Sequence, residues 1–501
     1  MQKNVTKYRA HLTIIPLSSQ KNIHVYPAES TVSFMTEYSS VKPELLRELE
    51  SIVGSKSISV LSEDLVKYGK DESLEPPHTP EVIVFPMSTG QISSVMKLAS
   101  TNNIPVTPQG SRTGLSGGAH PVYGGIALSL ERMTKILEID EENLMAVVEP
   151  GVLIMDLHAE TEKRGLLYPP DPGQESGSLG GNISTNAGGV KGMKYGVTRD
   201  FVQGLEVVLP SGEILTIGGK HVKNSTGYEL IDLFVGSEGT LGVVSKATLR
   251  LVPKPKNTAI IYVPFDSARA AAKTVSEIVS RKVVPYALEY VPRHAVLTAE
   301  RFLERTLPDH DHPAYLIVGV DGNSENEIDR QLDIVGEVCT EMGGADAYLA
   351  DTPSQQQQLW EARKCLFEAY KAFYEIDEVD ACVPRSRFPD YVEGAEKISE
   401  RLGILISTIG HAGDGNAHSI MAREQAEDRV AWLKKLDVAI EELIELSLGL
   451  GGTISGEHGV GYAKKKYLVR KVGVTQVNLM RVIKRGFDPQ NILNPGKVID
   501  I

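Results

Sequence analysis

The sequence predicts an α+β protein built as two lobes. Amphipathic helices alternate with short apolar strands from about residue 40 to the C-terminus. Three stretches rich in glycine, serine and asparagine fall in the first half only. A proline-broken segment, Pro253–Lys256, separates that half from a second one of different texture. We therefore expect an N-terminal extension over 1–39, a first domain over 40–255 and a second domain over 256–501.

The elements of the first half follow from local patterns. Residues 42–54 have apolar positions at helical spacing and end on a glycine, and residues 153–165 share this pattern. Residues 88–103 begin with Ser and Thr, which cap helices. A hairpin is predicted over 204–218 with its turn at Ser211–Gly212. Strands are predicted at 80–86, 124–133, 144–151 and 245–255.

The second half repeats the alternation with longer helices. Apolar periodicity predicts helices over 267–282, 324–344 and 424–450. Strands are predicted over 314–322, 403–410 and 417–422. The last two strands flank the motif GHAGDGNAHS, which is where the chemistry of this half is expected.

The composition excludes several classes of function. A net charge of −13 argues against a nucleic-acid partner. The three cysteines form no C-x-x-C pair, so the chain encodes neither a disulfide framework nor an iron–sulfur cluster, and a reducing compartment is expected. No apolar run approaches the ~18 residues needed to span a bilayer. Met1–Ala28 lacks Asp and Glu, and we interpret it as a short extension, with a targeting segment as the alternative.

The glycine-rich stretches lie at 105–119, 169–189 and 234–244. Such loops can bring several backbone N–H groups close to a phosphate, because glycine has no Cβ. They match neither the P-loop nor the Rossmann pattern. The first stretch alone is better explained as a flexible loop. Three in one lobe favour an extended anionic cofactor laid along backbone amides.

The motif from Gly410 to Ser419 contains a strong hairpin signal, Asp414–Gly415. With these two as the central turn residues, His411 would lie directly opposite His418 on one face, with Cβ atoms roughly 5 Å apart. Two imidazoles at that spacing can share a divalent cation. The alternative is a polar hairpin tip with two solvated histidines.

A second motif, SGEHG, could complete such a site. Glu457 would add a carboxylate to the two histidines, which gives three ligands and open positions, as in catalytic metal sites. The neighbouring His458 is a natural general base, or else a core histidine that holds the loop. An anionic substrate also requires a cation, and the candidates are Arg363, Arg385 and Arg387.

Long motifs in this chain resemble a known family. The segments PQGSRTGLSGG, DPGQESGSLGGNISTNAGG and LFVGSEGTLGVV resemble the FAD-binding domain of the vanillyl-alcohol oxidase (PCMH-type FAD) superfamily. The nearest branch is the D-lactate dehydrogenase, glycolate oxidase D-subunit and D-2-hydroxyglutarate dehydrogenase group, and the resemblance covers roughly residues 40–500. It implies a two-lobed PCMH-type FAD-binding domain, then an α+β substrate (cap) domain, with a C-terminal segment that returns to the flavin.

The resemblance implies FAD as cofactor, with its pyrophosphate on the loop at 109–116. Members that attach FAD covalently carry a histidine in this loop, where the present chain has Arg112, so non-covalent FAD is expected. The residues expected to line FAD are Pro108, Gln109, Gly110, Ser111, Arg112, Thr113, Gly114, Ser116, Asp171, Gly177, Ser178, Gly181, Asn182, Asn186, Gly188, Gly189, Gly242, Val244 and Asn494.

The resemblance also assigns roles in the second half. It implies a divalent metal, zinc or manganese, on His411, His418 and Glu457, with His458 as the catalytic base. The arginine of WEAR, Arg363, becomes the first choice for the substrate carboxylate, and Arg385 the second. The 2-hydroxyglutarate branch has polar residues where this chain has Phe367 and Ile420, which favours a short or apolar-tailed hydroxy acid.

The expected activity is FAD-dependent oxidation of a D-2-hydroxy acid, D-lactate above all, with electrons passed to cytochrome c, a quinone or an electron-transfer flavoprotein. The first alternative is the flavin subunit of a glycolate oxidase complex with an iron–sulfur partner chain. D-2-hydroxyglutarate dehydrogenase, an ether-lipid synthase and a non-catalytic flavin-binding protein are further alternatives. We expect a cytoplasmic location, with peripheral attachment at the inner membrane left open, or a mitochondrial one in a eukaryote.

Overall fold

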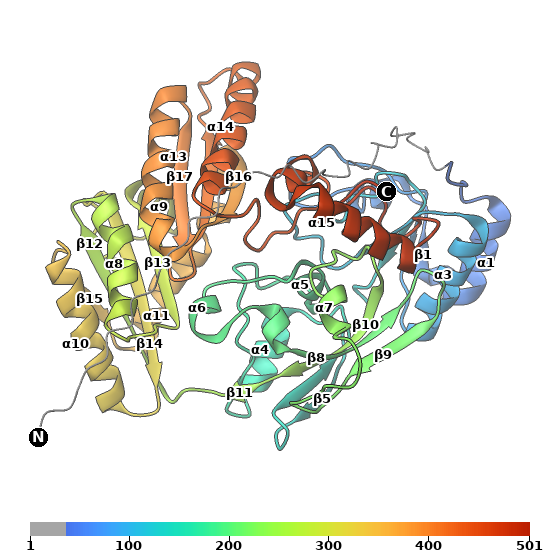
Figure 1. Ribbon diagram of the computed structural model, residues 1–501, viewed down its shortest axis with the longest axis horizontal. Coiled ribbons are helices and arrows are strands. Elements are labelled where there is room, and N and C mark those ends of the chain that lie inside the picture. The colour runs from blue at the N-terminus through green and yellow to red at the C-terminus, as the bar shows by residue number, and fades with distance from the viewer. Residues whose placement is uncertain (1–36) are drawn as a thin grey trace, which may run out of the picture. The chain divides into compact units, whose positions relative to one another are not determined.

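Two β-sheets and their helices make up the N-terminal half of the protein (Figure 1). The computed structural model describes residues 37–501, so the predicted extension lies, except for its last three residues, outside the described part of the chain. Among the described residues, no helix is both long and apolar enough to cross a membrane.

The first sheet has the strand order β1-β2-β4-β3, in which β2, β4 and β3 run parallel. Apolar residues of α1 and α3 pack on it and form a buried core. Ser88 caps α3 by accepting a hydrogen bond from the backbone N–H of Gln91. The elements are α1 (Pro43–Val53), β1 (Ile58–Ser59), α2 (Ser62–Lys67), β2 (Val82–Val84), α3 (Thr89–Asn102), β3 (Val106–Gln109) and β4 (Ile126–Ser129).

The second sheet is antiparallel, with the order β5-β6-β10-β8-β9, and α4 and α5 pack against it. A two-stranded pair, β7 with β11, lies beside it. The elements are β5 (Ile136–Asp140), β6 (Met145–Val148), α4 (Ile154–Glu162), β7 (Leu166–Leu167), α5 (Leu179–Thr185), α6 (Gly192–Tyr195), β8 (Val202–Val208), β9 (Ile214–Gly218), α7 (Ile231–Phe234), β10 (Val243–Arg250) and β11 (Val252–Pro253).

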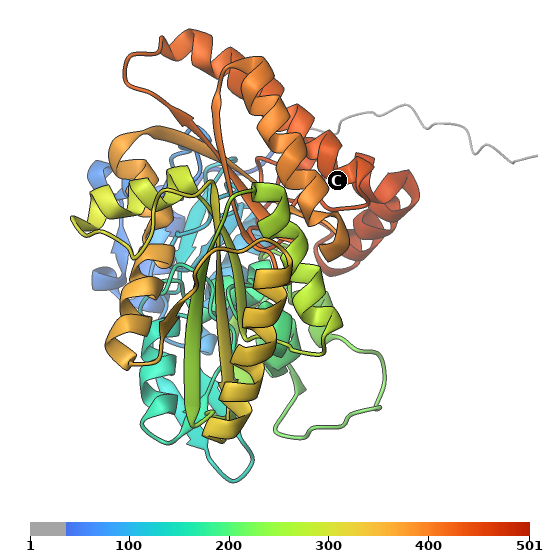
Figure 2. The ribbon, with the colours of Figure 1, turned by 90° about the vertical axis from the view of Figure 1, so that its left-hand side faces the viewer.

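The C-terminal half is built on one seven-stranded sheet, with the order β15-β12-β14-β13-β17-β18-β16. Helices α8, α10, α13 and α14 cover one face, and Figure 2 shows helices on both sides of the strands. Helices α9, α11 and α12 cover the other. The strands are β12 (Asn257–Phe265), β13 (Ala287–Pro292), β14 (Ala314–Gly322), β15 (Tyr348–Ala350), β16 (Glu375–Cys382), β17 (Leu405–His411) and β18 (Asn416–Arg423). The helices are α8 (Ala268–Ser280), α9 (Arg293–Leu303), α10 (Glu325–Glu341), α11 (Pro353–Lys364), α12 (Leu366–Phe373), α13 (Phe388–Leu402) and α14 (Arg429–Gly449).

The end of the chain returns to the first sheet. After α15 (Lys465–Phe487), which is kinked at Gly473, the backbone pairs with β3. The N–H of Val106 donates to the carbonyl of Ile492 at 2.7 Å, and the N–H of Asn494 donates back to the carbonyl of Val106 at 2.7 Å. The C-terminal segment thereby extends the edge of the sheet that carries the first glycine-rich loop.

The mixed helix and sheet architecture confirms the predicted fold class. The predicted helices correspond to α1, α3, α4, α8, α10 and α14. Helix α14 begins at Arg429 rather than Glu424, because the side chain of Asp428 caps it there. Among the elements that were not predicted are the strands β12, β13 and β16 and the helices α9, α13 and α15. Residues 38–501 form one compact unit, and the division at residue 255 stays a prediction.

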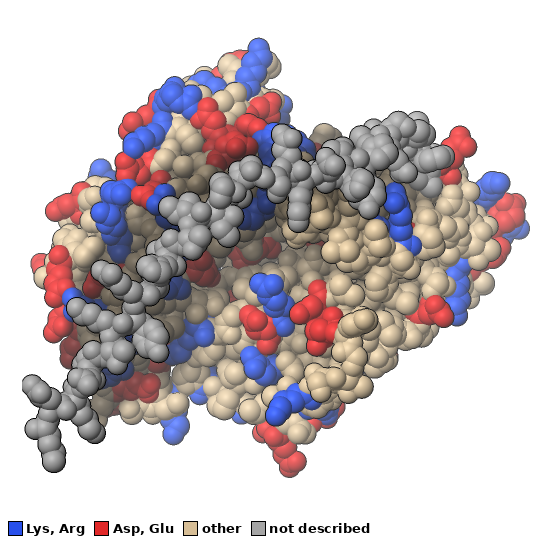
Figure 3. Space-filling view, in the orientation of Figure 1, with Lys and Arg blue, Asp and Glu red and all other residues tan. Residues whose placement is uncertain are grey.

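The net negative charge is not gathered on the face that Figure 3 shows. Acidic and basic side chains are interspersed there across both halves of the chain. Many are paired with each other, as in the ion pair of Arg269 with Asp390 at 3.1 Å. The surface charges of this face therefore do not indicate a binding site, and the buried charges are considered next.

Candidate active site

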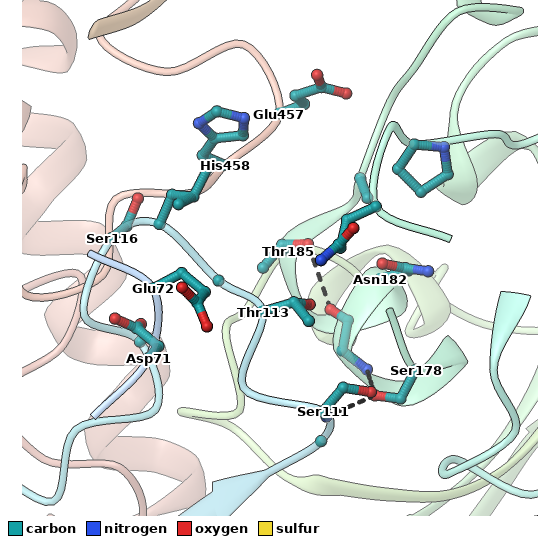
Figure 4. Close-up of a pocket in the computed structure, with 18 of the residues that line it drawn as sticks. Asp71, Glu72, Ser111, Thr113, Ser116, Ser178, Asn182, Thr185, Glu457 and His458 are labelled. Atoms are coloured by element: carbon teal, nitrogen blue, oxygen red, sulfur yellow. Dashed lines mark hydrogen bonds between the residues drawn. The ribbon is translucent and has the colours of Figure 1, made fainter. Parts of the chain in front are cut away.

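One large cavity extends from the first glycine-rich loop to the hairpin formed by β17 and β18. Figure 4 shows Ser111 and Ser178 on one side of it, and Glu457 and His458 on the other. Thirteen of the nineteen residues expected to bind FAD line this cavity. They are Pro108, Gln109, Gly110, Ser111, Arg112, Thr113, Gly114, Ser116, Ser178, Gly181, Asn182, Gly242 and Val244.

Close packing explains why the glycine-rich loop can lie against α5. Ser178 caps α5 by accepting a hydrogen bond from the N–H of Gly181 at 3.3 Å, and the N–H of Ser111 lies 3.4 Å from the same oxygen (Figure 4). A Cβ at Gly110 would lie 2.1 Å from that oxygen. Only glycine therefore allows this approach, which leaves the loop and the start of α5 side by side along the cavity.

The other six expected cofactor residues are not among those that line this cavity. Asp171 pairs with Lys191 at 3.0 Å and Lys364 at 3.3 Å, and it faces a second cavity. Burial acts to raise the pKa of Asp171, but the two ammonium groups hold it below its usual value. Asn494 donates to the carbonyls of Gly118 and Glu238. Gly177, Asn186, Gly188 and Gly189 also lie outside the lining.

Arg112, which stands in the first loop where covalently flavinylated members carry a histidine, lines the cavity. Its guanidinium lies 3.9 Å from the centre of the Tyr68 ring and 3.2 Å from a carboxylate oxygen of Glu131. Among the described residues that line the cavity, the histidines are His411, His418 and His458, all from the second half of the chain.

The hairpin carries the two motif histidines in a register different from the predicted one. His411 pairs with Asn416, and Ile409 pairs with His418, so the connection has four residues rather than two. The predicted direct pairing of His411 with His418 is therefore wrong. The two histidines are diagonal neighbours on the same face, and their ring centres lie 5.2 Å apart. Gly415 makes the longer turn possible, since its φ is +86°.

Both imidazoles present the same nitrogen to Glu457. Its Oε1 lies 3.5 Å from Nε2 of His411 and 3.2 Å from Nε2 of His418. Each Nδ1 is hydrogen-bonded to a different carboxylate. Nδ1 of His411 lies 2.9 Å from Glu289, and Nδ1 of His418 lies 2.7 Å from Glu378. Metal-binding histidines commonly have this second hydrogen bond to a carboxylate. The donor set of His411, His418 and Glu457 therefore fits a divalent metal.

The charge balance around His411, His418 and Glu457 also favours a bound cation. Four buried carboxylates surround the three imidazoles, namely those of Glu289, Glu378, Asp380 and Glu457. Among the described residues, only Arg363 and Lys464 pair with them as permanent cations. Uncompensated charge is costly in a protein interior. Two extra protons on the imidazoles, or one divalent cation, would balance the two remaining negative charges.

The pKa values show how strongly this environment favours positive charge. Burial acts to lower the pKa of His411, but Glu289 and Glu457 raise it to about 9. Burial likewise acts against protonation of His418, while Glu378 and Glu457 raise its pKa well above the usual value. A metal bound here would take the place of those protons.

Two buried carboxylates hold the loop that contains Glu457 and His458. Oδ2 of Asp380 accepts hydrogen bonds from the backbone N–H groups of Gly456, Glu457 and His458, at 2.9, 3.0 and 2.9 Å. Glu238, from the third glycine-rich stretch, accepts from the N–H groups of Val460 and Gly461 at 2.7 and 2.8 Å. The loop is thus held by one carboxylate from each half of the chain.

His458 faces the cavity beside the hairpin. Its ring stacks on that of His418 with the centres 5.2 Å apart, and its Nδ1 lies 3.8 Å from Oδ2 of Asp380. Gly188 approaches Glu457 so closely that a Cβ there would lie 2.8 Å from Oε2 of the carboxylate. The first half of the chain therefore packs directly against this loop.

The three candidate arginines have different surroundings. Arg363 lines the cavity, and its Nε donates to Oε2 of Glu289 at 2.8 Å. Arg385 is not among the residues that line the cavity, and it donates to the carbonyl of Gly413, which supports the hairpin turn. Arg387 is half-exposed and pairs with Asp390.

Four residues of this site were not found from the sequence, namely Glu238, Glu289, Glu378 and Asp380. Glu289 had a usable signal, since an acidic residue inside an apolar strand requires a partner. Glu378 and Asp380 alternate on β16, a strand that was not predicted. Glu238 lies in the third glycine-rich stretch, which was interpreted only as part of the cofactor site.

The glycine-rich cavity and the polar cluster at its end define a cofactor-dependent enzyme, and the comparisons identify the class as FAD-linked oxidoreductases. Residues 80–218 match the model of the FAD binding domain, and residues 254–498 match that of the FAD linked oxidases, C-terminal domain. The chain belongs to the family of FAD-linked oxidases.

Curated relatives cover nearly the whole chain. A D-lactate dehydrogenase of Anaerostipes hadrus is 38% identical over 92% of this chain and 98% of its own length. The glycolate oxidase subunit GlcD of Bacillus subtilis is also 38% identical, over 91% of this chain and 97% of its own.

Solved structures share the fold at low identity. p-Cresol methylhydroxylase superposes with a TM-score of 0.76 at 19% identity, over 91% of this chain and 96% of that one. The 4-ethylphenol oxidase of Gulosibacter chungangensis has a TM-score of 0.74 at 20% identity, over 90% of this chain and 96% of that one. These neighbours confirm the vanillyl-alcohol oxidase type of fold.

The geometry predicts the effect of weakening the Asp380 anchor. In Asp380→Asn the neutral side chain holds the N–H groups of residues 456–458 less well, so local opening of the loop becomes easier. We expect amide hydrogen exchange at these residues to accelerate by about 100-fold, as the loss of about 3 kcal/mol would give. The variant Asp377→Asn, on the same strand, is the control. Unchanged protection in Asp380→Asn would contradict the anchoring role.

Proposed function

We propose that the protein oxidises a D-2-hydroxy acid, D-lactate above all, to the 2-oxo acid with non-covalently bound FAD and a divalent metal. The carrying observation is the convergence of His411, His418 and Glu457 beside His458 and Arg363 in the cavity that the cofactor loop lines. The near full-length similarity to proteins named D-lactate dehydrogenase supports the substrate class.

The bound groups would supply the chemistry that side chains lack: FAD accepts a hydride, and a divalent metal, zinc or manganese, lowers the pKa of a hydroxyl that it binds. His411, His418 and Glu457 would hold the metal through two Nε2 atoms and one carboxylate oxygen. This leaves positions open for a substrate, as in catalytic sites.

The chain's own residues would bind and orient the hydroxy acid. Arg363 would hold the carboxylate and fix the orientation of C2. His458 would remove the hydroxyl proton as C2 loses its hydride. Arg385 donates to the carbonyl of Gly413 in the hairpin turn, so we do not propose it as a substrate ligand.

The shape and polarity of the cavity support a small or apolar-tailed substrate. Phe367, Ile409 and Ile420 line the cavity together with Arg363 and the metal-site histidines. A second carboxylate against these side chains would lose hydration without a partner. This disfavours D-2-hydroxyglutarate and leaves room for the methyl group of lactate.

A second candidate is the flavin subunit of a glycolate oxidase complex, which the equal similarity to GlcD of Bacillus subtilis favours. Such a subunit would pass electrons to a partner chain with iron–sulfur clusters, and co-purification of a cysteine-rich chain would support it. For the dehydrogenase, the acceptor (cytochrome c, a quinone or an electron-transfer flavoprotein) and the location stay predictions from the resemblance.

Anaerobic reduction of the flavin by four acids tests the substrate proposal. We expect D-lactate to bleach the flavin fastest, and L-lactate not to react, because binding through the same metal and Arg363 contacts would exchange the places of its C2 hydrogen and its methyl group. Glycolate should react several-fold more slowly, since it lacks the methyl group that would be buried, worth about 0.8 kcal/mol. Fastest bleaching by D-2-hydroxyglutarate would overturn the substrate, and fastest bleaching by glycolate would favour the second candidate.

The role of His458 as base has its own test. His458→Ala should keep FAD bound, because His458 is not one of the expected cofactor residues. Reduction of the flavin by D-lactate should slow by about a hundredfold to ten-thousandfold, as expected when a general base is removed. His310→Ala, in a loop remote from the cavity lining, is the control. Rapid bleaching in His458→Ala would remove this role.

A further inference from the structure

Glu289 touches two groups that the proposed function uses for different purposes. Nε of Arg363 donates to Oε2 at 2.8 Å, and Nη2 lies 2.7 Å from the same oxygen. Nδ1 of His411 lies 2.9 Å from both carboxylate oxygens. Glu289 is fully buried on β13, and burial acts to raise its pKa, but His411 and Arg363 hold the pKa below its usual value. One carboxylate therefore serves both partners.

We infer that Glu289 is a positioning residue that couples the metal ligand His411 to the substrate clamp Arg363. This inference rests on the proposed function. Because Glu289 accepts a hydrogen bond from the Nδ1–H group of His411, Nε2 is the nitrogen that would bind a metal when the metal displaces the proton there. Without an acceptor at Nδ1, the ring could move its hydrogen to Nε2 and lose its ability to bind metal.

The same carboxylate determines how Arg363 can meet a substrate. Glu289 lies along the edge of the guanidinium formed by Nε and Nη2, which leaves Nη1 and the outer N–H of Nη2 to face a substrate carboxylate. A planar guanidinium held along one edge is fixed in orientation. The metal and the arginine would then be held at a constant separation, which suits a hydroxy acid that spans both.

A neutral amide at position 289 could not serve both partners. A carboxylate offers two accepting oxygens, whereas glutamine offers one oxygen and one NH₂ donor. Once metal occupies Nε2 of His411, its Nδ1 must donate, so the glutamine would turn its oxygen to His411. Its NH₂ group would then face the donors of Arg363 and displace the guanidinium.

Glu378 is the matched comparison within the same site. It accepts from Nδ1 of His418 at 2.7 Å, as Glu289 does from His411. Among the described residues it pairs with no arginine. A glutamine at 378 could therefore turn its oxygen to the one imidazole without leaving Arg363 displaced.

The test compares E289Q, E378Q and E361Q as holoenzymes. We expect E289Q to bind zinc about 10- to 100-fold more weakly than the wild type, in competition with a chelator. With zinc saturating, E289Q should recover most of its kcat but keep a KM for D-lactate raised by about tenfold. E378Q should raise KM less, and E361Q, an exposed glutamate on α11, should change neither quantity.

Three results would overturn the inference. The first is zinc affinity and KM in E289Q equal to those of the wild type. The second is an equal rise of KM in E378Q, which would indicate general loss of charge rather than coupling. The third is a ¹⁵N-histidine spectrum of the zinc-loaded wild type in which zinc sits on Nδ1 of His411, a readout that does not require any variant to fold. A wild type that binds no divalent metal would instead contradict the proposed function itself.

Discussion

The candidate site depends on the hydrogen bonds that one buried carboxylate, Asp380, accepts from three consecutive backbone N–H groups. These bonds fix residues 456–458 above the hairpin, and Glu238 fixes the following residues from the other half of the chain. Both residues are buried, so their backbone partners cannot be exchanged for solvent without a large cost. The loop therefore has one position, and that position brings Glu457 to the histidines and His458 to the cofactor cavity.

The local parts of the site could be predicted from sequence because they depend on neighbouring residues. The Asp414–Gly415 signal correctly indicated a hairpin, although the connection is longer than predicted. His411 and His418 nevertheless lie on the same face of the hairpin, as predicted. The register differs from the predicted one by two residues, since His411 pairs with Asn416 instead of His418, and a shift of two preserves the alternation of side chains, so a direct pair became a diagonal pair. The glycine-rich stretches likewise indicated the cofactor cavity without any knowledge of the third dimension.

The partners of these groups could not be predicted, because they come from segments far apart in the chain. Glu289 lies on β13, more than a hundred residues before His411, and Asp380 lies on β16, far from the loop that it anchors. A sequence pattern shows that a buried acid requires a partner, but not which one. The family resemblance predicted the groups that are proposed to meet ligands, and it left out the four carboxylates that contact those groups or their loop. Three of them, Glu289, Glu378 and Asp380, supply most of the buried negative charge around the imidazoles, and that charge favours a divalent cation.

The position at which a metal binds tests the proposed site most directly. Anomalous diffraction from crystals loaded with zinc and soaked anaerobically with D-lactate measures this position. We expect one peak at about 2.0–2.2 Å from Nε2 of His411, Nε2 of His418 and an oxygen of Glu457, with the lactate carboxylate against Arg363. A fully loaded crystal with no peak there, or with lactate bound away from Arg363 and His458, would contradict the account.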